Sequence, residues 1–195
     1  MTQFEFFMTF YGLLLGLSVA ELFSGFARII QDRTPPRVGI ILPMLGLIAV
    51  IEFIATFIDA WTSLTGVSIS FVDLFLPTLI ALSYFALAAI LVPRQFDEWP
   101  DLSAYFDHRR AWIIGLLLTA NLLIISTIMM TSVPERIRDE DWSGLTFHIA
   151  RSAWLIASYV VLLFSRKRWL DIAAAASVIA FYIFNYVVRP LLLGI

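Results

Sequence analysis

The sequence has no cysteine among its 195 residues, and it has only two histidines and one lysine. Without cysteine, disulfide bonds, thiolate catalysis and cysteine-ligated metal or iron–sulfur centres are excluded. His108 and His148 fall on opposite sides of the membrane in the topology predicted below. They therefore cannot ligate one haem or metal ion within a single chain. We expect no metal site and no cofactor.

Motifs of common enzyme classes are also missing. The sequence contains no H-E-x-x-H, no G-x-S-x-G, no P-loop and no dinucleotide-binding fingerprint. Only 14% of the residues are charged, the formal net charge is −2, and no long basic run occurs. These properties argue against an enzyme and against a nucleic-acid partner.

Apolar residues dominate what is present. They make up 61% of the chain, whereas a soluble domain has about 45–50%. They gather in six stretches, each close to the roughly 20 residues that a helix needs to cross a bilayer. The stretches run over residues 4–30, 38–63, 69–92, 111–131, 147–164 and 169–193. The sequence predicts an all-α, polytopic six-helix transmembrane bundle, with residues 1–195 forming a single transmembrane domain.

One connection is long enough to hold structure of its own. Between the third and fourth stretches, Trp99, Leu102, Tyr105 and Phe106 recur at three- and four-residue spacing. This spacing predicts a short amphipathic helix on the membrane surface. The alternative is a helical lead-in to the stretch at 111–131.

The basic residues of the connections favour one topology. Nine lie in the first, third and fifth connections and two in the fourth. The nine are Arg28, Arg33, Arg37, Arg94, Arg109, Arg110, Arg166, Lys167 and Arg168; the two are Arg136 and Arg138. By the positive-inside rule, the odd connections are cytoplasmic and both termini periplasmic. Because arginine outnumbers lysine twelve to one, we predict a bacterial protein of the inner membrane.

The first stretch carries a row of small residues at four-residue spacing. The row consists of Gly12, Gly16, Ala20 and Ser24. Such a row lets another helix backbone approach closely, which is how helices associate in lipid. We expect the row to pack against a helix of the same chain; contact with a second copy, giving a homo-oligomer, is the alternative.

Several charged residues fall inside the predicted spans. Near the outer face, Asp59 and Asp73 are predicted to form buried ion pairs with Arg151 and Arg189. Ionisable groups inside a membrane are costly, so they normally pair or serve function. These four residues are electrically balanced, which favours a structural role.

Glu52 and Glu21 have no cation at their own depth in the predicted spans. Glu52 lies near the middle of the second span, and Thr56 and Asp59 follow it at helical spacing toward the outer face. Asn121, in the middle of the fourth span, is expected in the same interior, as are Tyr84, Tyr182 and Asn185. We interpret Glu52, Glu21, Asp59, Thr56 and Asn121 as a path for protons or small cations. The alternative is that each glutamate is protonated and hydrogen-bonded to a neighbouring helix.

Three functions follow from these features. The first is passage of protons or small cations through the acid-lined bundle. The second is a non-transporting accessory or scaffold protein that self-associates or binds a partner through the small-residue row. The third is binding of a lipid or another apolar ligand between helices. The ion, the substrate, the oligomeric state and the partner do not follow from the sequence.

Overall fold

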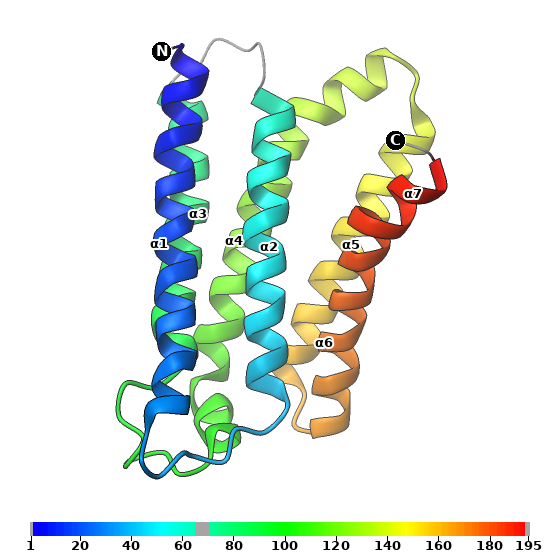
Figure 1. Ribbon diagram of the computed structural model, residues 1–195. Coiled ribbons are helices and arrows are strands. Elements are labelled where there is room, and N and C mark those ends of the chain that lie inside the picture. Colours follow the sequence, from blue (N-terminus) through cyan, green and yellow to red (C-terminus); the bar gives the residue numbers. More distant parts are fainter. Residues whose placement is uncertain (1, 65–70, 194–195) are drawn as a thin grey trace.

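The computed structural model describes residues 2–64 and 71–193, with side chains described except at 63–64, 71–73, 131–132, 135 and 192–193. These residues form helices and no strand (Figure 1). The α-helices are α1 (Gln3–Gln31), α2 (Ile41–Leu64), α3 (Phe71–Leu91), α4 (Leu102–Arg138), α5 (Trp142–Phe164), α6 (Arg168–Ile183) and α7 (Arg189–Leu193). A π-helix, η1 (Phe184–Val188), joins α6 to α7.

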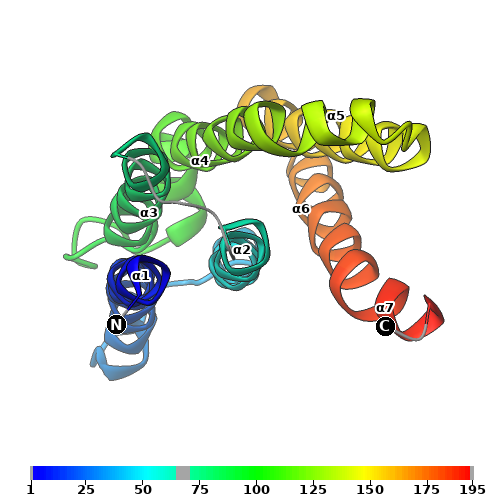
Figure 2. The same cartoon turned by 90° about the horizontal axis from the view of Figure 1, so that it is seen from above.

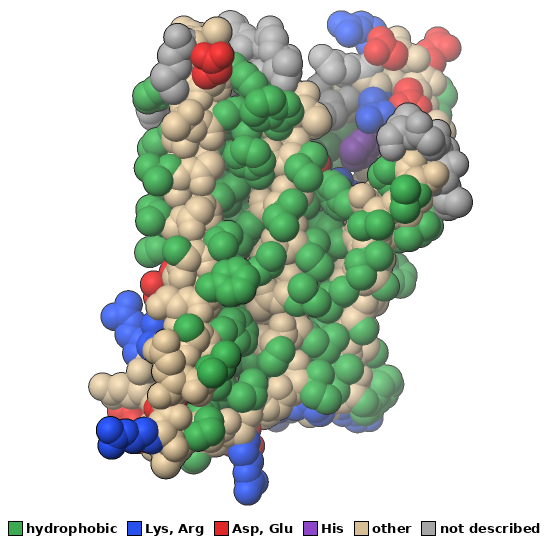
Figure 3. All heavy atoms as spheres, viewed as in Figure 1, with side chains coloured by type: hydrophobic (Ala, Val, Ile, Leu, Met, Phe, Trp, Pro, Cys, Tyr) green, Lys and Arg blue, Asp and Glu red, His purple; other side chains and the backbone are tan. Residues whose placement is uncertain are grey.

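Six helical segments of the described chain are long and apolar enough to cross a membrane. They are Gln3–Gln31, Ile41–Thr62, Leu74–Leu91, Leu102–Met130, Trp142–Phe164 and Arg168–Leu191. The prediction of an all-helical chain with six candidate spans is therefore confirmed. Apolar side chains cover most of the face seen in Figure 3, and charged side chains gather toward its two ends. This distribution suits a multi-pass membrane protein.

The fourth candidate span belongs to a longer helix than predicted. At 37 residues, α4 is about 55 Å long, which exceeds the roughly 30 Å of a bilayer's hydrocarbon core. Leu102, Tyr105 and Phe106 lie in its first turns, so the prediction of a separate amphipathic helix is wrong. The helix continues because no proline or glycine interrupts residues 102–114. The alternative, a helical lead-in, is what the structure has.

Helix α2 lies at the centre of the bundle. It contacts α1, α3, α4 and α6, while the other helices follow one another around it in the order α1, α3, α4, α5, α6 (Figure 2). Buried residues make up 56% of its most apolar stretch, against 22–39% in the other candidate spans. A polar side chain in the middle of α2 is therefore shielded from the surroundings of the bundle by neighbouring helices.

Both chain termini lie at one end of the bundle (Figure 1). The connections α1–α2, α3–α4 and α5–α6 lie at the other end, and the nine basic residues belong to these connections and to the helix ends next to them. There, Arg37 bridges to the start of α4: its N–H donates to the carbonyl of Pro100 at 2.9 Å, and its carbonyl accepts from Leu102 at 3.0 Å. We call the basic end the inner end; that it faces the cytoplasm stays a prediction.

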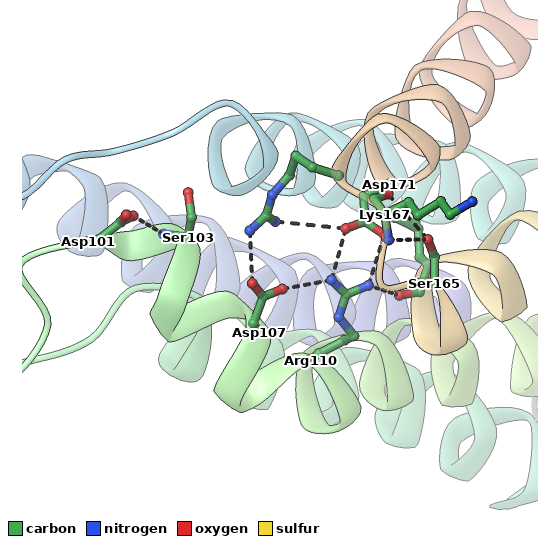
Figure 4. Close-up of polar contacts among 9 residues, drawn as sticks. Asp101, Ser103, Asp107, Arg110, Ser165, Lys167 and Asp171 are labelled. Carbon is green, nitrogen blue, oxygen red and sulfur yellow. Dashed lines mark hydrogen bonds and ion pairs between the residues drawn. The ribbon is translucent and has the colours of Figure 1, made fainter.

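A buried ion pair joins α4 and α6 at the inner end. The guanidinium of Arg110 donates to both carboxylate oxygens of Asp171 at 2.8 Å, and also to the carbonyl of Leu162 in α5 at 2.8 Å (Figure 4). Asp171 is only 1% exposed. Asp107 accepts from Arg110 at 2.7 Å and from Arg168 at 2.9 Å, which extends the network to the surface. Removing one partner of such a pair leaves an uncompensated buried charge, so this network holds three helices together.

The small-residue row of α1 does not pack as expected. Only Gly12 meets another helix of the chain: a Cβ built there would lie 3.3 Å from the Phe57 ring of α2. Gly16, Ala20 and Ser24 are exposed, and nothing lies within 4 Å of a Cβ built at Gly16. Helix α1 buries a different face (Tyr11, Leu15, Ser18, Leu22). The prediction that Gly16, Ala20 and Ser24 pack against a helix of the same chain is therefore wrong.

Candidate functional site

Glu52 is the buried acid at the centre of the bundle. It lies on α2, twelfth of 24 residues, and is 1% exposed. The residues before and after it on the same helix, such as Ile48, Ala49 and Phe53, are buried and apolar. A carboxyl group in such surroundings is costly unless hydrogen bonds replace the water that it has lost.

Four neighbouring helices supply those hydrogen bonds. The Tyr159 hydroxyl donates to Glu52 Oε1 at 2.5 Å, the Tyr182 hydroxyl at 3.0 Å, and Asn121 Nδ2 at 3.0 Å. The Tyr84 hydroxyl donates to Oε2 at 3.2 Å. These donors come from α5, α6, α4 and α3, so one carboxyl group connects five helices. We call Glu52, Tyr84, Asn121, Tyr159 and Tyr182 the Glu52 cage.

The donors set what the Glu52 cage can bind. Tyrosine hydroxyls and an amide N–H direct hydrogen atoms at the carboxylate, whereas a metal cation needs oxygen lone pairs directed at it. Within the described residues, no group of three or more acidic, histidine or cysteine side chains is placed to hold a metal ion. The chemistry of the Glu52 cage therefore favours a proton over a metal cation as its partner.

The two oxygens of Glu52 are not equivalent. Oε1 accepts three hydrogen bonds, whereas Oε2 accepts one, from Tyr84. The Tyr84 hydroxyl lies 3.3 Å from Thr56 Oγ1, and either atom can be the donor of that bond. If Oε2 takes up a proton, it can donate to Tyr84, whose hydroxyl then donates to Thr56. Rotation of hydroxyl groups thus lets the Glu52 cage accept a proton without moving its helices.

A second polar cluster lies above the Glu52 cage, toward the end that carries the termini. The Tyr186 hydroxyl donates to Asp59 Oδ1 at 3.0 Å, and Arg151 lies 3.5 Å from Asp59 Oδ2 and 3.4 Å from the Tyr186 hydroxyl. The rings of Tyr182 and Tyr186 stack with centroids 6.1 Å apart, which connects this cluster to the Glu52 cage. Asp59 and Arg151 thus lie together.

The other two members of the predicted outer ion pairs differ. Arg189 is exposed, and its guanidinium lies 4.2 Å from the centroid of the Phe147 ring, a cation–π contact. The side chain of Asp73 lies outside the described part of the structure.

The cluster around Asp59 reaches the surface. The Asp59 side chain is 36% exposed and that of Arg151 14%. Figure 3 shows the molecule hollowed between the upper ends of α2 and α5, with a histidine at the wall of the hollow. The order Glu52, Thr56, Asp59 along α2 therefore runs from a fully buried carboxyl to one that meets the surface.

The local helix geometry near Tyr186 is unusual. Residues Phe184–Val188 form a π-helix, whose i→i+5 hydrogen bonds widen the turn. Pro190 lies two residues after its end, has no N–H to donate, and crowds the carbonyl four residues earlier, that of Tyr186. The sequence therefore breaks the regular helix where Tyr186 meets Asp59 and Arg151.

Glu21 is not part of the Glu52 cage. It lies on α1 and is half-buried, and none of the cage's hydrogen bonds reaches α1. Beside the cage, Ser158 of α5, which precedes Tyr159, lies with its hydroxyl 3.3 Å from that of Ser177 of α6. Ser177 lies between Tyr182 and Asp171 along α6. The polar residues below the cage thus belong to α5 and α6.

The sequence predicts most of the Glu52 cage but not Tyr159. Asn121, Tyr84 and Tyr182 are expected in the interior because polar groups in mid-span face other helices. Tyr159 gives a weaker signal of the same kind, because it is the eighteenth of the 23 residues of α5 and lies toward the inner end of that helix. Only packing tells which of several mid-span tyrosines reaches the carboxylate.

Comparison of the chain with models of known protein families, with curated proteins and with solved structures found no match.

Tyr159→Phe is expected to lower the free energy of unfolding by about 1–3 kcal/mol, because it removes a hydrogen bond to a buried carboxyl group. Thermal unfolding in detergent would measure the loss. Tyr11→Phe is the matched control: Tyr11 is also buried, and its hydroxyl has no hydrogen-bond partner within the described residues. Equal effects of the two substitutions would show that the Tyr159 bond does not stabilise the bundle.

Proposed function

We propose that this protein is a multi-pass membrane protein that passes protons through its helix bundle, with Glu52 as the group that binds and releases the proton. The observation that carries this proposal is the Glu52 cage. A carboxyl group is 1% exposed at the centre of six apolar helices, and every hydrogen-bond partner that it has is a neutral donor.

A purely structural role explains the Glu52 cage less well. Apolar side chains of similar volume stabilise a helix bundle without the desolvation cost of a carboxyl group. Ionisable residues inside membrane spans are rare and are typical of proton relays. The reversible bond between Tyr84 and Thr56 supports a relay, because a proton can leave Glu52 along it.

The outer half of the route runs from Glu52 through Tyr84 and Thr56 toward Asp59. Asp59 is part-exposed and held by Tyr186 and Arg151. A proton that reaches Asp59 meets water at the end of the bundle that carries the termini.

The inner half of the route is assigned to α5 and α6. Ser177 lies between Tyr182 and Asp171 along α6, and its hydroxyl is 3.3 Å from that of Ser158, which precedes the cage residue Tyr159 on α5. Along α6, Ser177 is five residues from Tyr182 and six from Asp171, rises of about 7.5 and 9 Å along the helix axis. In this proposal, water molecules complete the hydrogen-bonded chain between Ser177 and the inner end.

The proposed orientation follows the basic residues. The inner end carries nine arginine and lysine residues in its three connections and the adjoining helix ends, so we assign it to the cytoplasm and both termini to the periplasm of a bacterial inner membrane. Asp59 would then face the periplasm.

Glu52→Gln is the sharpest test of this proposal. The amide oxygen can take the place of Oε1 and accept its three hydrogen bonds, while the amide N–H₂ donates to Tyr84 as a protonated Oε2 would. The fold should therefore survive, whereas the proton flux across reconstituted vesicles should fall by about 100-fold, the scale on which a lost proton-transfer group acts.

Glu21→Gln is the matched control, because it removes another carboxyl group from a candidate span without touching the Glu52 cage. Its flux should equal that of the parent. A parent protein without proton flux, or a Glu52→Gln variant with the parent's flux, would contradict the proposal.

An accessory or scaffold role is the second candidate, and the exposed row on α1 favours it. Gly16, Ala20 and Ser24 lie side by side on a helix face that no other described part of the chain covers. Small residues on an open face permit close contact with a second helix, of this chain's own copy or of a partner.

Gly16→Leu is expected to abolish self-association in lipid while leaving the stability of the monomer unchanged, because Gly16 is exposed and a Cβ built there meets no described atom within 4 Å. Cross-linking in vesicles measures the association. Gly115→Leu is the control, since a Cβ built at Gly115 on α4 also meets no described atom within 4 Å. A parent that is monomeric in lipid, or a Gly16→Leu variant that still associates, would reject self-association through this row.

A further inference from the structure

A groove lies between α3 and α4 at the inner end of the bundle. Its volume is about 400 Å³. It is lined by Ala86, Ala89, Ile90, Val92, Pro93, Arg94, Tyr105, Arg109, Trp112 and Leu116. The two helices are antiparallel, so Arg94 and Arg109 lie at the inner end of the groove and Ala86 and Leu116 lie deeper in the bundle. One end of the groove is thus basic and the other apolar.

The hollow has a simple cause in the sequence. Ala86 and Ala89 are too small to fill the space against α4, whereas Leu116 and Trp112 line the opposite wall. The Tyr105 hydroxyl donates to the carbonyl of Ile90, which fixes the separation of the two helices at this level. The apolar part runs about 10 Å along α4 from Arg109 to Leu116.

The two arginines of the groove have no acidic partner within the described residues. No ion pair or hydrogen bond joins either to a carboxylate, and both are exposed. Their neighbour Arg110 differs, because Asp171 and Asp107 neutralise it (Figure 4). The basic end therefore offers two free guanidinium groups, each able to bind a phosphate in bidentate fashion.

We propose that this groove binds a diacyl phospholipid with an anionic headgroup. Arg94 and Arg109 bind the phosphate, Trp112 lies at the level of the ester groups, and an acyl chain follows Ala86, Ala89 and Leu116 into the bilayer. Three features fit this occupant: unpaired positive charge at the inner end, an apolar channel that continues toward the bilayer centre, and an exposed indole between them.

A second hollow at the inner end fits such a lipid less well. It lies between α4 and the end of α5 and includes Asp107, and its Arg110 is already neutralised. The α3–α4 groove has basic side chains and no acidic one in its lining. It shares no residue with the Glu52 cage, so lipid binding and proton passage can fail independently.

The proposal is tested by titrating purified protein, in an uncharged detergent, with phosphatidylglycerol, phosphatidylcholine or inorganic phosphate. Binding is followed by native mass spectrometry and by the rise in unfolding temperature. Phosphatidylglycerol should bind and raise the unfolding temperature, and phosphatidylcholine should bind more weakly. If the two lipids have equal effects, the site does not require an anionic headgroup and the headgroup assignment is wrong. If inorganic phosphate has the same effect as phosphatidylglycerol, the groove binds phosphate and the lipid assignment is wrong.

Two variants locate the site. Arg94→Ala/Arg109→Ala should weaken phosphatidylglycerol binding about 30-fold, a factor of about five for each arginine near an anionic lipid. Ala89→Leu keeps both arginines but fills the groove, so it should also lose the lipid.

The control Arg33→Ala/Arg37→Ala removes the same charge from exposed positions at the same end and should bind as the parent does. If the control weakens binding as much as Arg94→Ala/Arg109→Ala, or if Ala89→Leu binds like the parent, the groove is not the site.

Discussion

Hydrogen bonding to the carboxyl group of Glu52 is the interaction on which the rest of the structure depends. A carboxyl group buried among apolar helices is tolerated only when donors replace its water. Here the donors come from α3, α4, α5 and α6, one side chain from each. The four helices must therefore surround α2 at a common depth. The need to satisfy the carboxyl group of Glu52 therefore also explains why α2 lies at the centre of the bundle.

Glu52 also marks the depth at which the interior of the bundle changes in polarity. Above Glu52, Asp59, Arg151 and Tyr186 continue the polar interior to the surface, and the π-helix η1 lies where Tyr186 turns toward them. Below it, contacts are mostly apolar until the Arg110–Asp171 pair joins α4, α5 and α6. A proton bound at Glu52 would thus have polar neighbours on one side and two serine hydroxyls on the other. This asymmetry is compatible with controlled proton passage and differs from an open pore.

The sequence predicted the helices better than their contacts. Stretches of apolar residues determine candidate spans by length alone, so all six were found. Glu52 and Asn121 stood out because polar residues in mid-span are costly. The direction of each helix face was harder to predict: Gly16, Ala20 and Ser24 signal close packing equally well whether the neighbour is inside or outside the chain. The partnership of Arg110 with Asp171 depends on residues 61 positions apart, and no local pattern encodes it.

In the proposed function, Glu52 binds and releases a proton inside the folded bundle. Infrared difference spectroscopy tests this most directly, because a protonated carboxyl group has a C=O stretching band that the carboxylate lacks. The Glu52 signal is the part of the spectrum that disappears in Glu52→Gln. We expect this band to appear and disappear reversibly as the pH changes while the helices stay intact. A Glu52 signal that is identical at every pH at which the bundle is folded would contradict it.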